Sequence, residues 1–427
     1  STASYNTAVG YDSLKVNSTG AHNAAFGKGA LIANTTASYN NALGSNVLAA
    51  NTTGASNVGI GYAALNANTT ASYNTAVGHN ACTVNTTGSS LTAVGSYALD
   101  ANTTGNYNTA FGSSALGANT TSANNTALGY SALYVNTAAN NTAVGHNSGS
   151  SITTGTQNTF VGAAAGDAMT TSNDNTAIGC YALTSGTSGH SNFAGGVASL
   201  NDCTTGYSNV AVGYFAGYSI NSGYSNTIIG HGAGDTMTTA HSNTIMGFDA
   251  GNAVTTGGNN LLLGKNAGVS GSPGGSISTG SSTIVLGDEN MGSCNIQTDW
   301  TVASDERDKT DFTDLDIGLD FVKALAPVTY KWDKRAKYGD KTADDYDLNA
   351  QTPDGTHKED WLDVGFKAQD VETLEKAAGY KMADKTNLMT SLTTDGKQYG
   401  LQYSKFIPIL VNAIQELSAE VEKLKGG

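Results

Sequence analysis

Charged residues and proline are scarce in this chain. Asp, Glu, Lys and Arg make up 13% of the 427 residues, about half the usual share, and there are 4 prolines against 53 glycines. The first 303 positions hold three lysines and no arginine against ten acidic residues, and the whole chain has a net charge of −14. Because nucleic acids and anionic membranes attract basic surfaces, this composition excludes both as partners of that part of the chain.

Cysteine is also rare, and no long apolar run is present. The four cysteines show no C-x-x-C spacing, so we expect no metal site and no cofactor. We predict reduced, buried thiols, consistent with assembly in a reducing cytoplasm. No run approaches the ~18 apolar residues of a membrane span, so we expect no membrane insertion. Ser1 falls inside a repeat unit and is not preceded by Met, which predicts a missing upstream attachment segment.

The chain contains 17 repeat units. Each unit ends on the glycine of a short motif such as N-T-A-V-G. Every step is 17 residues except one of 16, and the last unit follows an insertion around Pro273. We call these residues the marker glycines: Gly10, Gly27, Gly44, Gly61, Gly78, Gly95, Gly112, Gly129, Gly145, Gly162, Gly179, Gly196, Gly213, Gly230, Gly247, Gly264 and Gly287.

Other positions keep the same register and predict a β-solenoid. An apolar residue precedes each marker glycine except at Gly195, and Asn stands four residues before most of them. Short strands such as Thr75-Ala76-Val77 alternate with turns rich in Asn, Gly and Ser, which would break a helix. If each unit is one coil, 17 coils spaced ~4.8 Å apart make a rod of roughly 80 Å. We expect the apolar row to fill a narrow core and the Asn rows to hydrogen-bond along the stack.

The units Asn74–Gly78 and Asn108–Leu116 resemble the head repeats of trimeric autotransporter adhesins, which also occur in phage tail fibres. The resemblance covers about residues 1–290, although the usual unit of that family is shorter than 17 residues. It implies a homotrimeric β-solenoid (β-roll) shaft, so that the first partner of the chain is itself.

The composition changes near residue 304, where charged residues become common. We predict a solenoid shaft over residues 1–290, a linker over 291–303 and a small α/β domain over 304–427. Its last helix spans about 404–425 and carries apolar residues at heptad spacing. Either this helix packs on its own domain or it forms a trimeric coiled coil. The seam consists of Leu410, Ile414, Leu417, Val421 and Leu424.

The segment Ser304-Asp305-Glu306-Arg307-Asp308-Lys309, together with Val364–Asp370 and the terminal helix, resembles a C-terminal intramolecular chaperone. This is the self-cleaving chaperone of endosialidase-type phage tailspikes and tail fibres. The resemblance implies that Ser304 and Lys309 form a catalytic dyad that cuts the Ala303–Ser304 bond, with Asp305 and Arg307 in support.

The serine needs a base, and lysine can serve as one only where it is desolvated. Without the resemblance, the hexapeptide favours the alternative that Ser304 is a helix cap and Lys309 a solvated charge.

The combined features predict a phage tail fibre that serves host attachment. Its expected place is the virion after assembly in the host cytoplasm, and its expected partners are an upstream virion or tail protein and a host receptor. The receptor could be a glycan held by an aromatic row, although such a row is also typical of simple packing. The alternatives are a bacterial surface adhesin and an ice- or mineral-binding solenoid. The aromatic row comprises Tyr11, Tyr62, Tyr130, Tyr214, His79, His146 and His231.

Overall fold

The computed structural model describes residues 2–297, 300–341, 343 and 345–426. The chain forms two compact units. Unit 1 comprises Ser1–Asn266 and Ser278–Ile284, and unit 2 comprises Ala267–Ile277 and Val285–Gly427. The insertion around Pro273 therefore belongs to unit 2, although the sequence places it between two coils of the repeat.

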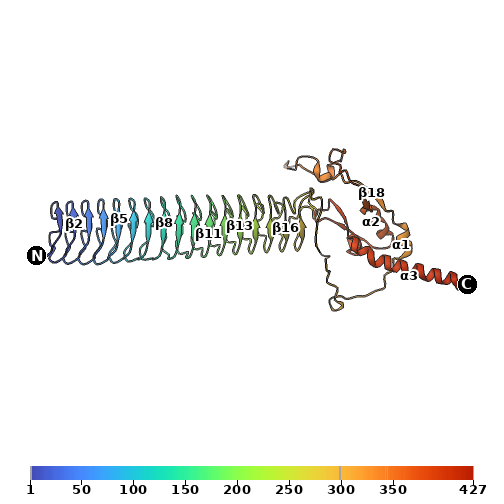
Figure 1. The fold of residues 1–427 in the computed structure, drawn as a ribbon, viewed down its shortest axis with the longest axis horizontal. Coiled ribbons are helices and arrows are strands. Elements are labelled where there is room, and N and C mark those ends of the chain that lie inside the picture. Colours follow the sequence, from blue (N-terminus) through green and yellow to red (C-terminus); the bar gives the residue numbers. More distant parts are fainter. Residues whose placement is uncertain (1, 298–299, 342, 344, 427) are drawn as a thin grey trace. The chain divides into compact units, whose positions relative to one another are not determined.

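Unit 1 is a parallel β-solenoid in which each repeat unit adds one three-residue strand to a single ladder (Figure 1). Neighbouring strands pair in register, as Thr75 does with Thr92 and Val77 with Val94. The predicted mostly β solenoid is therefore confirmed. The strands are β1 (Thr7–Val9), β2 (Ala24–Phe26), β3 (Asn41–Leu43), β4 (Val58–Ile60), β5 (Thr75–Val77), β6 (Thr92–Val94), β7 (Thr109–Phe111), β8 (Thr126–Leu128), β9 (Thr142–Val144), β10 (Thr159–Val161), β11 (Thr176–Ile178), β12 (Phe193–Gly195), β13 (Val210–Val212), β14 (Thr227–Ile229), β15 (Thr244–Met246), β16 (Leu261–Leu263) and β17 (Ile284–Leu286).

The marker glycine is required where each strand ends. Gly78 has φ of +143°, a backbone conformation that residues with a side chain rarely adopt. A Cβ at Gly78 would lie 2.3 Å from the carbonyl oxygen of Gly95 in the next coil. The repeat therefore depends on glycine here because successive coils approach each other backbone to backbone.

The core of unit 1 is built differently from our expectation. The residue before each marker glycine was predicted to fill the core, but Val9 is 56% exposed, Leu43 53% and Phe111 52%. Side chains alternate along a strand, and the middle residue, such as Ala76, is the buried one. The predicted apolar row therefore faces outward, and the prediction that it forms the core is wrong.

The bulk of the core comes from the residue four positions after the marker glycine. Leu99 is fully buried and has φ of +51°, which is strained for a residue with a side chain. In later coils glycine takes this place without strain, as at Gly166 with φ of +62°. A Cβ at Gly166 would lie 2.5 Å from the ring of Phe160, so the larger strand residue fills the space that leucine fills elsewhere.

Buried asparagines join each coil to the next. Asn209 donates through Nδ2 to Oδ1 of Asn192 (3.1 Å) and to the carbonyl oxygen of Gly223 (2.8 Å). Its own Oδ1 accepts from the backbone N–H of Asn226 (3.1 Å). The prediction that Asn rows hydrogen-bond along the stack is confirmed. A second row of the same kind joins Asn68 to Asn85.

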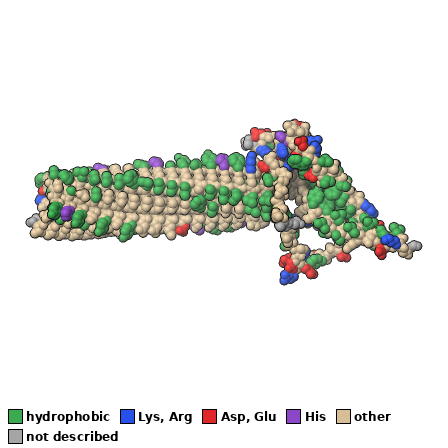
Figure 2. Space-filling view, viewed as in Figure 1, with side chains coloured by type: hydrophobic (Ala, Val, Ile, Leu, Met, Phe, Trp, Pro, Cys, Tyr) green, Lys and Arg blue, Asp and Glu red, His purple; other side chains and the backbone are tan. Residues whose placement is uncertain are grey.

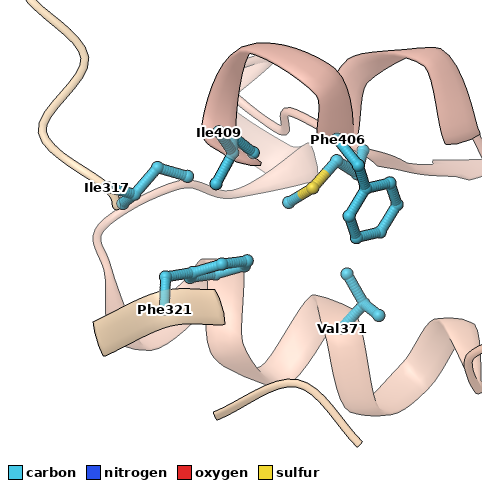
Figure 3. Close-up of a cluster of buried hydrophobic side chains, with 6 residues drawn as sticks. Ile317, Phe321, Val371, Phe406 and Ile409 are labelled. Atoms are coloured by element: carbon cyan, nitrogen blue, oxygen red, sulfur yellow. The ribbon is translucent and has the colours of Figure 1, made fainter. Parts of the chain in front are cut away.

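Unit 2 is a small α/β unit whose described residues form two antiparallel strand pairs and three α-helices. Its hydrophobic core joins the first and last helices to the middle of the unit (Figure 3). The core residues are Ile317, Phe321, Val371, Met389, Phe406 and Ile409. The elements are η1 (Glu306–Asp308), α1 (Leu319–Ala324), β18 (Val328–Tyr330), η2 (Arg335–Lys337), η3 (Leu348–Ala350), β19 (Asp363–Gly365), α2 (Ala368–Ala377), η4 (Met382–Asp384), β20 (Thr390–Leu392), β21 (Tyr399–Leu401), η5 (Tyr403–Lys405) and α3 (Phe406–Lys425).

A buried carboxylate joins α2 to β20. Glu375 is 1% exposed and accepts from the backbone N–H of Leu388 (2.9 Å), from that of Met389, and from the hydroxyl of Thr390. Hydrogen bonds of this kind satisfy a charge that burial would otherwise destabilise. The last helix is joined to the start of α1 in a similar way, because Glu416 accepts from the backbone N–H of Leu319 at 2.6 Å.

We predict that Asn209→Ala weakens the solenoid locally by about 3 kcal/mol, because it leaves the N–H of Asn226 and the carbonyl of Gly223 buried without their partner. Hydrogen exchange over the coils around residues 209–226 measures this local opening. Thr205→Ala, at an exposed position of the same coil, is the matched control. Unchanged protection in Asn209→Ala would show that the asparagine row does not hold the coils together.

A second prediction concerns pH. Burial raises the pKa of Asp235 to about 6, the charge of Asp249 adds to this, and the Thr236 N–H and His231 oppose it. Because the folded pKa lies above the unfolded value, ionisation costs stability as the pH rises from about 4 to 6. Asp235→Asn should therefore stabilise the chain at pH 8, by about 1 kcal/mol because solvent screens a half-exposed group.

Thermal unfolding at pH 4 and pH 8 tests this prediction. The stabilisation by Asp235→Asn should fall to a small fraction at pH 4, where the folded carboxyl is protonated and the unfolded one is about half protonated. Asp174→Asn removes the same charge at an exposed position and is the control. An equal gain at both pH values would contradict the assignment.

Candidate functional site

The structure brings Ser304 and Lys309 into direct contact. Lys309 Nζ donates to Ser304 Oγ at 2.6 Å and lies 3.3 Å from the carbonyl oxygen of the same serine. The contact depends on η1, a single 3₁₀ turn that lies between the two residues. The N–H of Lys309 donates to the carbonyl oxygen of Glu306 at 3.1 Å, which returns the chain toward Ser304.

Asp305 and Arg307 shape this turn. Asp305 caps it by accepting from the backbone N–H of Arg307 at 2.9 Å, and the guanidinium Nη2 pairs with the same carboxylate at 2.6 Å. These hydrogen bonds from Arg307 lower the pKa of Asp305, while the carboxylate raises that of Arg307. The N-cap of the turn is thus Asp305 and not Ser304, which leaves the Ser304 hydroxyl available to Lys309.

The site lies in water within a single chain. Every described residue from Trp300 to Asp314 is exposed, including the apolar Val302 (79%) and Phe312 (67%) on either side of the dyad. Lysine acts as a base where its surroundings exclude water, and the described side chains of one chain provide no such cover. The geometry for proton transfer is therefore present, but the dry environment is not.

Unit 2 also contains a groove that sequence reasoning missed. It encloses about 770 Å³, and its walls include Tyr330, Trp332 and Tyr403. Glu289 borders it as a buried residue whose Oε1 pairs with Lys341 and whose Oε2 has no hydrogen-bond partner among the described residues. Its residues come from positions 271 to 403, so no local motif could have revealed it.

The insertion of the last repeat is held within unit 2. The backbone N–H of Ser276 donates to Asp395 at 2.9 Å, and the side chain of Gln398 donates to the carbonyl oxygen of Ser272 at 3.3 Å. Burial alone would raise the pKa of Asp395, but hydrogen bonds from Ser276, Thr393 and Lys397 outweigh it and lower the pKa. The charged form of Asp395 is therefore the one that binds the insertion.

Members of the aromatic row stack in separate short runs along the solenoid, such as Tyr62 on His79 and Tyr130 on His146, while Tyr11 is 73% exposed. The centroids of Tyr214 and His231, and of His231 and Phe248, are 5.1 Å apart with nearly parallel planes. A second row not foreseen from the sequence includes Tyr207 stacked on Tyr224 at 5.0 Å. Rings stacked in this way cover one another's faces and leave mainly edges to solvent. This favours the packing role over glycan binding, because a sugar stacks on an open ring face.

The part of the chain that the structure describes contains neither a metal-binding cluster nor a membrane-spanning helix. No group of three or more His, Cys, Asp or Glu side chains is arranged to hold a metal ion there. No helix in that part is long and apolar enough to cross a bilayer.

Residues 304–380 match a family model described as the chaperone of endosialidase. The match begins at Ser304 and includes Lys309 and the groove residues Tyr330 and Trp332. No curated protein matches the chain. The chain thus combines a β-solenoid with a C-terminal region that is similar to the chaperone of endosialidase.

Proposed function

We propose that this chain is a subunit of a homotrimeric phage tail fibre whose C-terminal region assembles three copies and then cuts itself off before Ser304. The observation that carries the proposal is the 2.6 Å contact between Lys309 Nζ and Ser304 Oγ, at the first residue of the region that matches the chaperone model. The solenoid is the fibre shaft in this proposal, and unit 2 is its assembly factor.

The last helix supports self-association. Its first turns pack on unit 2 through Phe406, Ile409 and Ala413, which are buried. The heptad seam remains in water within one chain, since Ile414 is 64% exposed and Leu424 83%. A seam of this kind is buried when helices of other copies pack against it. One face of the helix packs on its own domain, and we assign the trimeric coiled coil to the other face.

The proposed cut uses atoms that are already close. Ser304 Oγ attacks the carbonyl carbon of Ala303 while its proton passes to the Lys309 amine. The C–N bond breaks, an ester forms between Ala303 and Ser304 Oγ, and the leaving nitrogen takes the proton back from Lys309. Water then hydrolyses the ester, which gives a carboxylate on Ala303 and a free hydroxyl on Ser304.

Assembly would switch this reaction on. The dyad is exposed in one chain, and a lysine base needs cover. Neighbouring copies that bury Val302 and Phe312 would supply that cover, so cleavage would follow correct trimer formation. Loss of the assembly region then leaves a shaft that cannot easily return to separate chains, which is kinetic stability.

The role of the whole fibre in host attachment follows from the proposal that the chain is a phage tail-fibre subunit. A tail fibre attaches the virion to a host cell, so its partners are an upstream tail protein and a host surface receptor. His231 lies between the rings of Tyr214 and Phe248, so both of its faces are covered and it is a poor site for a stacked sugar.

We predict that the wild-type chain yields a shaft fragment ending at Ala303 and a second fragment beginning at Ser304. Ser304→Ala and Lys309→Gln should each abolish the cut, because one lacks the nucleophile and the other the base. Intact-mass measurement of purified protein identifies the new ends. Lys323→Gln, a change at an exposed lysine paired only with Asp320, is the control. Cleavage of Lys309→Gln at the wild-type rate would exclude the dyad.

We also predict that Ile414→Ser with Leu417→Ser lowers both oligomer mass and cleavage. Each side chain would lose about 1.5–3 kcal/mol of burial in an assembled seam. Light scattering on the uncut Ser304→Ala background measures the mass, and the cleavage-competent chain measures the cut. Ala419→Ser, at an exposed position off the seam, is the control. A wild-type mass in the double variant would show that α3 does not assemble the chains.

A further inference from the structure

Tyrosines recur at one turn position in every second coil at the start of the solenoid. We define the tyrosine register as the residue five positions before each marker glycine. Each register residue of the first seven coils has φ between +57° and +64°, and from the second coil on its backbone N–H donates to the preceding coil at 3.1–3.2 Å. These side chains therefore leave the coils at equivalent points. In chain order they are Tyr5, His22, Tyr39, Ser56, Tyr73, Ser90 and Tyr107.

Tyrosine is an unusual residue for this backbone conformation. A positive φ is tolerated best by Asn and Asp, and later coils place Asn124 and Asp174 at the register. Tyr39 is 60% exposed, Tyr73 70% and Tyr107 65%, so packing against the solenoid does not offset the strain of these rings. Strained residues of this kind cluster where a protein holds a ligand.

The first pair of tyrosines shows what fits between two such side chains. Tyr5 and Tyr39 lie two coils apart, which is about 9.6 Å at the ladder spacing of ~4.8 Å per coil. The ring of His22 lies between them, with centroid distances of 4.8 Å to Tyr5 and 5.1 Å to Tyr39 and with planes within 11° and 2° of parallel. One ring therefore fills the space between two tyrosines of the register.

The next two spaces are open. Tyr39 and Tyr73 flank Ser56, and Tyr73 and Tyr107 flank Ser90, each pair again two coils apart. A serine side chain is too short to fill the space that an imidazole fills. In the part of the chain that the structure describes, neither Tyr73 nor Tyr107 has an aromatic neighbour, and the two serine hydroxyls have no hydrogen-bond partner. We call these two spaces the ring gaps.

The surroundings of the ring gaps are polar but uncharged. Residues 29–166 contain one charged side chain, Asp100. Figure 2 shows few charged side chains on the visible face of the solenoid. A charged ligand would lose water here without gaining an ion pair, so the gaps favour a neutral one. Aromatic faces beside hydroxyl groups suit a pyranose, whose C–H face packs on a ring and whose hydroxyls bond to serine and tyrosine.

We propose that each ring gap binds one neutral pyranose ring of a host surface polysaccharide. The inference rests on the attachment role in the proposed function and names the chemical class of the receptor and its site. The sugar lies between two tyrosines as His22 does, so it enters from solvent as a terminal or branch unit. Tyr73 is a wall of both gaps. A branched polysaccharide that fills both gaps at once binds more tightly than a single sugar.

Binding to sugar-bearing polymers tests the proposal. The probes carry β-galactose, β-glucose or β-N-acetylglucosamine groups, and a matched polymer carries sialic acid. The wild-type chain should bind a neutral polymer more tightly than the charged one. Tyr73→Ala should lower that affinity at least about tenfold, because it removes a wall of both gaps. Tyr5→Ala, at the same register but beside the filled space, is the matched control and should bind as the wild type does.

Filling the gaps is a second test, and it keeps every tyrosine. Ser56→His with Ser90→His places imidazole rings as His22 does in the first space, so it should abolish binding while circular dichroism stays unchanged. Ser56→Ala with Ser90→Ala leaves the gaps open and should keep most of the affinity. Wild-type affinity in the histidine variant overturns the inference. So does a wild-type chain that binds none of the neutral polymers.

Other outcomes assign the gaps differently or separate this inference from the proposed function. If a polymer carrying phenyl groups binds more tightly than every sugar polymer, the gaps take an aromatic side chain of a protein receptor and the sugar is wrong. If the chain cleaves before Ser304 but binds no sugar, only the inference fails. If it binds neutral sugars through Tyr73 but neither assembles nor cleaves, only the proposed function fails, because the ring gaps lie within one chain.

Discussion

The solenoid depends on one constraint: its buried polar groups are satisfied by the next coil. Asn209 bonds to Asn192 on one side and to the backbone of Asn226 on the other, and the marker glycines bring backbones so close that no side chain fits between them. A coil on its own would have no neighbour to supply these partners, and its amides would be hydrated and not held in a buried network. The shaft therefore forms as a stack, with stability contributed by neighbours.

The same constraint decides which residues can face outward. The interior of a 17-residue coil is narrow, so the middle strand residue must be small where Leu99 and its equivalents fill the core, and can be large only where glycine replaces them. The larger residues before the marker glycines then have no place inside. Their exposure is therefore a consequence of how the coil is filled.

The Ser304–Lys309 site of unit 2 differs from the solenoid, because it is assembled by a short local segment and not by contacts between repeats. The turn at Glu306–Asp308 is enough to bring Lys309 to Ser304. Val302, Phe312 and the seam of α3 are exposed within one chain. In the proposed function, the association of copies removes water from both the helix seam and the dyad.

The sequence by itself determined the solenoid, the asparagine rows and the position of the last helix, because each arises from residues at a fixed period. The pairing of Ser304 with Lys309 was implied by the resemblance to the chaperone family and not by the spacing of the two residues. Tertiary structure alone decided that the residues before the marker glycines face outward. Alternation along a strand places either Ala76 or Val77 inside, and only the volume of the whole coil selects Ala76. It also decided the groove beside Glu289 and the docking of Ser276 on Asp395, because these contacts join residues 40 to 120 positions apart and leave no local pattern.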